Sequence, residues 1–176
     1  RIERDAPDEW FMERIAGKPS PPKGAVFANY FRPHIHVRDI EWDPAHPVRL
    51  WIDPGYDGAH AVEAVQVIGD VVYVIDEIYE KMGTESIIDI VRQRPWWDPG
   101  NMVPGVIDVY AYQHHAMDVT PAEIWAKETG MYFGSNKVRI MDGIDRFKSF
   151  LKPNPVTGEP KIFFAPHCRG VLSELG

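Results

Sequence analysis

The stretch Val48-Arg-Leu-Trp-Ile-Asp-Pro-Gly-Tyr-Asp57 decides the fold, because it predicts a buried strand that ends in an acid. Apolar residues lead up to Asp53, and the proline and glycine that follow it stop the strand. A second acid, Asp108, has the same setting in Val103-Pro-Gly-Val-Ile-Asp-Val-Tyr110. Carboxylate oxygens are the ligands that Mg²⁺ prefers. Two acids at strand ends therefore indicate a site for a divalent metal ion.

Two further strands are expected after the first, over residues 60–68 and 71–79. They are separated by Gly69-Asp70, which has the length and composition of a two-residue hairpin connection. The three strands are therefore expected to form an antiparallel meander.

Helices and strands alternate after the meander. Thr120, Pro121 and Glu123 mark one helix start, since the threonine and the glutamate fit a capping box and proline suits the first helical turn. Helices are expected over 84–92, from 120, over 139–151 and over 168–175, and strands over 103–110 and 161–165. This order predicts an α/β fold in which a mixed sheet, first antiparallel and then parallel, is flanked by helices on both faces.

Composition indicates one domain with a substantial core, because 44% of the 176 residues are hydrophobic. Residues 1–47 have an irregular pattern, with a short helix expected over 7–15 and a proline-rich connector at 17–24. They are predicted to be a linker that arrives from elsewhere. Cys168 is the single cysteine, which excludes an internal disulfide and a cysteine-rich zinc site and fits a reducing cytoplasm.

The formal net charge of −7 argues against a broadly basic nucleic-acid-binding surface. Basic residues nevertheless gather in the helix expected over 139–151, where Arg139, Arg146 and Lys148 are candidates for binding DNA phosphates. An ordinary solvated helix face is an equally good interpretation of this pattern.

The candidate metal ligands are Asp53 and Asp108, which suit Mg²⁺ or Mn²⁺ because both ions accept oxygen ligands. Asp57 and Glu77 are auxiliary candidates, although Asp57 also fits a turn. Asp76 and Glu77 are neighbours in one expected strand, so their side chains point to opposite faces and only one of them can serve.

Histidines give weaker indications. His114 and His115 follow the second acid and could contact phosphate or shuttle a proton, while a structural or solvent-exposed role is the alternative. His34 and His36 alternate as in a strand but lack a third ligand at zinc-like spacing, which argues against zinc. The sequence contains neither a G-x-S-x-G elbow nor a G-x-x-x-x-G-K-[ST] phosphate loop, so no ATP site is expected in it.

These motifs resemble the C-terminal nuclease domain of the large terminase subunit of tailed bacteriophages. The resemblance lies in Leu50 to Asp57, in Gly105 to Ala111, in the tail from Lys161 to Leu175, and in the segment from Gly24 to Phe31. It implies a ribonuclease H-like fold over 48–176, preceded at 1–47 by the entry from an ATPase domain. It also implies a two-metal endonuclease that cuts concatemeric double-stranded viral DNA in the host cytoplasm.

The same resemblance makes Asp53 the first catalytic acid, which bridges two metal ions, and Asp108 the second. It places the third acid beyond Gly176, so that the domain is incomplete at its C-terminus, and it implies the portal protein and the small terminase subunit as partners. Asp142 and Asp145 lie in a helix where the family has no catalytic acid. Two alternatives stay open: a domain that grips DNA or docks on partners with weak or no cleavage, and another ribonuclease H-like nuclease such as a resolvase or transposase.

Overall fold

The computed structural model describes residues 26–55, 58–113 and 119–176. The helix expected over 7–15 lies outside these residues, as do Asp57, His114 and His115.

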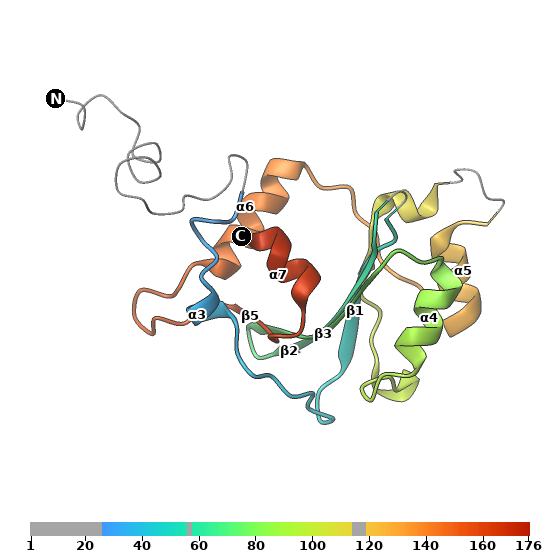
Figure 1. The fold of residues 1–176 in the computed structure, drawn as a ribbon, viewed down its shortest axis with the longest axis horizontal. Helices are drawn as coiled ribbons and strands as arrows, with labels where there is room; N and C mark the ends of the chain where they lie inside the picture. Colours follow the sequence, from blue (N-terminus) through green and yellow to red (C-terminus); the bar gives the residue numbers. More distant parts are fainter. Residues whose placement is uncertain (1–25, 56–57, 114–118) are drawn as a thin grey trace.

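A five-stranded mixed sheet forms the centre of the molecule (Figure 1). Its strands are β1 (Val48–Asp53), β2 (His60–Ile68), β3 (Val71–Glu80), β4 (Val106–Ile107) and β5 (Ile162–Phe164). The order across the sheet is β4-β1-β2-β3-β5. The first three strands pair antiparallel, β4 runs parallel to β1, and β5 runs parallel to β3. The predicted α/β fold, with an antiparallel meander followed by parallel strands, is confirmed.

Helices cover both faces of the sheet, with α4 and α5 on one side and α3, α6 and α7 on the other (Figure 1). Their bounds are Pro33–His36 for α3, Thr84–Arg92 for α4, Pro121–Thr129 for α5, Ile140–Leu151 for α6 and Arg169–Leu175 for α7. Two short 3₁₀ helices, η1 (Pro99–Asn101) and η2 (Val109–Tyr112), flank β4. Among the described residues, no helix is both long enough and apolar enough to cross a bilayer.

Two hydrophobic cores follow from the alternation of side chains along the strands. Leu50, Ile52 and Val62 pack with Ile87 of α4 and Trp125 of α5 in the first core. The second core holds other residues of the sheet together with α6, α7 and residues before β1; its members include Phe31, Val65, Val74, Leu151, Phe164, Cys168 and Leu175. Cys168 is buried there, and burial raises the pKa of its thiol far above the usual range.

The start of α5 confirms the predicted capping box. The Thr120 hydroxyl accepts the Glu123 backbone N–H at 3.3 Å, and the Glu123 carboxylate accepts the Thr120 backbone N–H at 2.7 Å. Pro121 occupies the first turn, and Gly130 ends the helix with φ of 73°. This cap fixes the place where α5 begins, next to the ends of β1 and β4.

One local prediction was wrong. The strand expected over 103–110 is limited to β4, because the side chain of Asp108 starts η2 instead of continuing the strand. His34 and His36 lie in the short helix α3, and the buried His36 ring bonds to the Leu151 carbonyl at 2.8 Å.

Residues 26–47 pack against the sheet. Phe31 is buried in the second core, Val37 forms a parallel bridge with Phe164, and the Gln66 side chain accepts the Asp43 backbone N–H at 3.0 Å. These contacts hold this segment to β2 and β5, while the boundary proposed at residue 47 stays a prediction.

Candidate active site

Pairing of β1 with β4 brings the two predicted acids together. Ile52 lies opposite Ile107 in the parallel register, and the Asp108 N–H donates to the Ile52 carbonyl at 2.9 Å. Asp53 and Asp108 each follow one of these paired residues, so they occupy neighbouring positions at the carboxyl ends of the two strands. The sequence could suggest this adjacency but not establish it, because the meander alone does not say which strand β4 joins.

Each of the two motifs that contain an acid, around Asp53 and around Asp108, has a glycine where two backbone segments lie very close together. A Cβ atom on Gly105 would lie 1.8 Å from the Leu50 carbonyl oxygen, so any side chain there would push β4 away from β1. Gly55 has φ of +45°, and a Cβ atom on it would lie 2.1 Å from the Ala59 carbonyl oxygen. Glycine is the residue that tolerates both situations. The Pro-Gly pairs at 54–55 and 104–105 therefore do more than interrupt the strands, because their glycines allow the close chain contacts that position Asp53 and Asp108.

Each carboxylate uses one oxygen atom to hold its own turn. Asp53 Oδ1 accepts the Gly55 N–H at 3.2 Å, and Asp108 Oδ1 accepts the Tyr110 N–H at 2.8 Å. Both side chains are exposed, and within the described residues neither Oδ2 atom has a hydrogen-bond partner. The local turns therefore orient both carboxylates and leave an oxygen on each for an external ligand.

The two acids form the polar part of a pocket of about 290 Å³. Its other described lining residues are mostly apolar: Pro54, Gly55, Tyr110, Ala111 and Pro121. The pocket thus joins three segments that are far apart in the sequence, namely the end of β1, the η2 turn and the start of α5.

The chemistry of this pair fits a hard cation. Mg²⁺ typically keeps several water molecules and takes one or two protein carboxylates together with phosphate oxygens of a substrate. No group of three or more histidine, cysteine or acidic side chains able to hold a metal ion occurs among the described residues. Within this part of the chain, Asp53 and Asp108 would supply the protein ligands.

Glu77 faces the same side of the sheet as Asp53, two strands away, and its carboxylate is engaged by the protein. Its two oxygen atoms accept the backbone N–H groups of Gly170 at 2.7 Å and of Val171 at 2.5 Å, at the start of α7. Gly170 is required there, because a Cβ atom would lie 2.5 Å from the Tyr79 ring. The auxiliary metal-ligand role of Glu77 stays a prediction, and its observed contacts are those of a helix cap.

Glu63 of β2 lies directly opposite Glu77 and was not identified from the sequence. Burial, together with the nearby Glu77 carboxylate, raises the pKa of Glu63 to about 9. Glu63 Oε2 is buried without a hydrogen-bond partner in the described part of the chain. At neutral pH Glu63 therefore carries a proton, which allows it to lie beside the Glu77 side chain.

Asp76 points away from Glu77, as the alternation of side chains predicts. Its carboxylate accepts the Trp96 indole N–H at 2.7 Å and lies 3.3 Å from both Arg94 Nε and His167 Nε2. Asp76 is buried, and the indole, guanidinium and imidazole N–H groups of its three partners can all donate to its carboxylate. This acid therefore belongs to an internal network that joins β3 to the segments after α4 and β5.

The three basic residues predicted to bind DNA lie on α6 or at its start, and two of them, Arg146 and Lys148, contact different parts of the fold. Arg146 lines an apolar groove of about 280 Å³ together with Trp51, which is two residues before Asp53 on the same side of β1. Lys148 instead lies over the Tyr30 ring, at 5.1 Å from its centroid. Arg139 is exposed immediately before α6. Only Arg146 is thus tied to the part of the sheet that leads to the acids.

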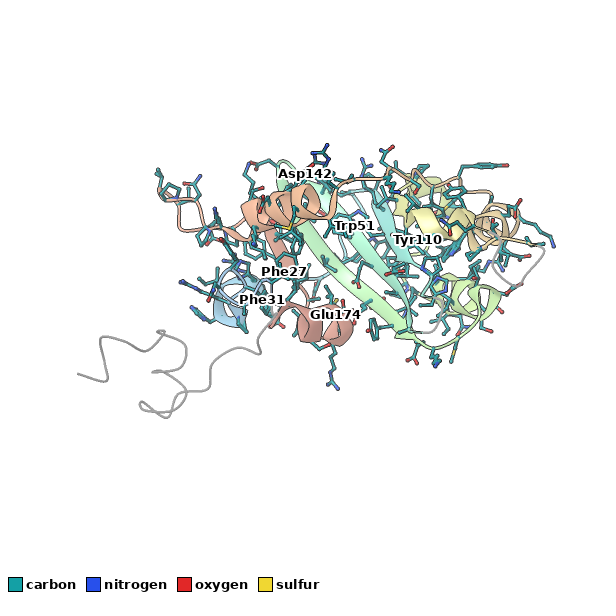
Figure 2. All side chains as sticks on the ribbon, turned by 90° about the horizontal axis from the view of Figure 1, so that it is seen from above. Phe27, Phe31, Trp51, Tyr110, Asp142 and Glu174 are labelled. Carbon is teal, nitrogen blue, oxygen red and sulfur yellow. The ribbon has the colours of Figure 1, made fainter. Side chains whose placement is uncertain are left out.

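Figure 2 shows the remaining acids of interest on separate helices, with Asp142 on α6 and Glu174 on α7. Glu174 accepts a hydrogen bond from the Tyr79 hydroxyl at 2.9 Å, which ties the end of α7 to β3. Asp142 lies in the exposed first turn of α6. Neither residue lines the pocket that holds Asp53 and Asp108.

Comparison with solved structures connects this arrangement to viral proteins. The large terminase of a thermophilic bacteriophage superposes with a TM-score of 0.65 at 14% identity, over 85% of this chain and 36% of that protein. The P22 large terminase nuclease domain gives 0.60 at 12% identity, over 85% of this chain and 76% of that domain. The chain has the fold of a large terminase nuclease domain.

A third similar structure is the nuclease domain of the large terminase of bacteriophage SPP1, solved with bound Mn. It superposes on this chain with a TM-score of 0.51 at 16% identity. That superposition covers 74% of this chain and 70% of the SPP1 domain. The chain spans about a third of the terminase from the thermophilic bacteriophage, of which 36% is covered. No protein-family model and no curated protein sequence matches the chain.

Proposed function

We propose that this chain is the metal-dependent nuclease domain of a viral DNA-packaging motor and that it cuts double-stranded DNA. The observation that carries the proposal is the pairing of Asp53 with Asp108 at neighbouring strand ends, each with an oxygen atom left for an external ligand. The likeness to the P22 and SPP1 nuclease domains supports it, as does the Mn bound in the SPP1 structure.

In the proposed mechanism Asp53 and Asp108 would hold the Mg²⁺ or Mn²⁺ ions through the carboxylate oxygens that their turns leave free. Such ions, when bound, activate water and stabilise the leaving oxygen of a phosphodiester. The N–H groups of Gly55 and Tyr110 keep the two carboxylates oriented toward the pocket.

The wider assignment also belongs to this proposal. A packaging nuclease would act on concatemeric viral DNA in the cytoplasm of the host, next to an ATPase motor, a portal protein and a small terminase subunit. Arg146, which lines the groove beside Trp51, is well placed to contact the DNA backbone near the acids.

Cleavage of plasmid DNA in Mg²⁺ or Mn²⁺ tests the assignment. Because the metal site supplies several kcal/mol of transition-state stabilisation, Asp53→Asn and Asp108→Asn should each lower the rate about a thousandfold or more. Asp142→Asn, an exposed acid outside the pocket, is the matched control and should cut at the rate of the unmodified chain.

Metal binding gives a second measurement that does not need cleavage. Mn²⁺ should raise the melting temperature of the unmodified chain and of Asp142→Asn, and this rise should be absent in both active-site variants. Equal cleavage and equal Mn²⁺ stabilisation in Asp53→Asn would refute the proposed site.

A DNA-gripping domain with little cleavage is the second candidate, and it is favoured by the presence of only two candidate metal-binding acids together in the described part of the chain. It predicts salt-sensitive DNA binding that survives Asp53→Asn. Neutralising Arg139, Arg146 and Lys148 should weaken binding and lower the slope of log K against log salt by about 0.9 for each lost phosphate contact. Neutralising the exposed Lys81 and Lys127 is the control and should leave the slope unchanged.

A further inference from the structure

The pocket around the acid pair offers more than a metal site requires. Hydrated metal ions and a phosphate group are polar throughout, whereas Pro54, Tyr110, Ala111 and Pro121 give the described part of this pocket a mostly apolar lining. A largely apolar pocket with a few polar groups at one place is typical of a site for an organic ligand. Its volume of about 290 Å³ is sufficient for a ring system next to the reacting phosphate.

Tyr110 is the lining residue with the largest exposed ring. Its side chain is 62% exposed, although its backbone is held firmly by the N–H bond to Asp108 and by the Gln113 N–H, which its carbonyl accepts at 3.0 Å. Tyr112, in the same turn, uses its hydroxyl to donate to the Phe133 carbonyl at 2.7 Å. The Tyr110 hydroxyl has no such partner within the described residues. In Figure 2 Tyr110 lies toward the α4 and α5 side, away from Phe27 and Phe31.

A fixed turn with an exposed aromatic ring suits a ligand that presents a flat face. Nucleobases have such a face, and they stack on aromatic side chains with little regard to sequence. The ring is two residues from Asp108, so a base on Tyr110 would belong to a nucleotide next to the phosphate held by the acids. The two prolines would then contact the sugar or the free face of the base.

We propose that this pocket receives one unpaired nucleoside of the DNA strand being cut, with its base stacked on Tyr110. The inference rests on the proposed nuclease function and adds a substrate preference to it. Both faces of a base within a duplex are covered by its neighbours, so Tyr110 can stack only on a base that has left the helix. The enzyme should therefore prefer DNA that is locally unpaired at the cutting site.

The test compares two DNA substrates that differ only in a short central bubble of mismatched bases. The unmodified chain should bind the bubble more tightly than the full duplex in Ca²⁺, as measured by fluorescence anisotropy, and should cut it with a higher kcat/KM in Mg²⁺. Tyr110→Leu keeps an apolar side chain but lacks an aromatic face, and it should lose about tenfold in both measurements on the bubble. Tyr110→Trp should retain the preference.

Tyr132→Leu is the matched control, because Tyr132 is 78% exposed and does not line the pocket. It should behave like the unmodified chain on both substrates. Melting temperatures should agree among all these variants, since both tyrosine rings are largely exposed.

The outcomes separate this inference from the proposed function. If the chain cuts DNA in a metal-dependent way but Tyr110→Leu matches Tyr132→Leu on both substrates, the nucleoside site is refuted and the nuclease assignment stands. If no cleavage occurs but the preference for the bubble in Ca²⁺ disappears in Tyr110→Leu alone, the nucleoside site stands and the nuclease assignment fails. A lack of preference for the bubble in the unmodified chain also refutes the nucleoside site.

Discussion

The acids at the β1–β4 edge differ from those in the middle of the sheet in what their oxygen atoms contact. Asp53 and Asp108 are exposed, bond only to their own turns and have an oxygen atom free of described partners. Asp76 and Glu77 are bonded to side chains or backbone from distant segments, and Glu63 lies opposite Glu77 with its Oε2 atom buried. Acids of the second group hold the fold together, and acids of the first group are positioned for something that binds from outside.

The strongest test of this contrast is Asp76→Ala, which should lower the free energy of unfolding by about 3 kcal/mol. The substitution leaves the indole N–H of buried Trp96 without an acceptor and removes the partner of Arg94 and His167. Chemical denaturation measures the change. Trp96→Phe removes one donor only and should cost less, and a double-mutant cycle should show coupling of about 1 kcal/mol.

Glu77→Ala should have the next largest effect, a loss of about 2 kcal/mol in the free energy of unfolding. It removes both charged acceptors of the backbone N–H groups at the start of α7. The exposed Glu80, three residues further along β3, provides the control. A loss of stability in Glu80→Ala as large as that in Glu77→Ala would argue against the helix-cap role.

Glu63→Gln should change how stability depends on pH. The folded chain keeps a proton on Glu63 up to about pH 9, whereas the unfolded chain releases it above about pH 4.5. Its contribution is therefore complete below pH 4.5 and is lost as the pH rises toward 9, by up to about 1.4 kcal/mol per pH unit. The amide is neutral at every pH, so Glu63→Gln should have a flatter profile between pH 6 and 9. Parallel profiles would show that Glu63 is ionised in the fold.

The smallest change in the free energy of unfolding is expected for the two exposed acids, Asp53 and Asp108. Asp53→Ala and Asp108→Ala should each change the free energy of unfolding by less than about 0.5 kcal/mol in the absence of metal, since each carboxylate bonds one N–H of a solvated turn. A loss comparable to that of Asp76→Ala would place both acids in the structural group and remove the contrast.

The sequence predicted the main elements well where the local pattern was strong. Thr120 and Glu123 predict the start of α5, and the two-residue connection at Gly69 and Asp70 predicts the hairpin of β2 and β3. These signals are local, because a cap or a tight turn is formed by residues within a few positions of one another. The placement of Asp53 at the end of β1 was predictable for the same reason.

Glu63 shows why the rest was not predictable. If β2 and β3 paired without interruption from the hairpin turn onward, Glu63 would lie opposite Asp76. A bulge between Ala64 and Val65 shifts the register by one residue, so that Glu63 lies opposite Glu77 instead. No local residue preference marks this bulge in advance. The apolar lining of the pocket was missed similarly, because Tyr110 and Pro121 meet only after α5 has docked.

The strand order indicates where a dye or a tether can be attached to the protein. The chain leaves the acid pair at Asp53 and returns to it at Asp108, and the connection between Ile68 and Val71 lies at the far end of the hairpin from both. The link between Asp70 and Lys161 at that turn is an exposed ion pair, so altering it is expected to cost little. A fluorescent dye or a tether for single-molecule pulling attached at residue 70 would report on the sheet while leaving the chemistry at the opposite end undisturbed.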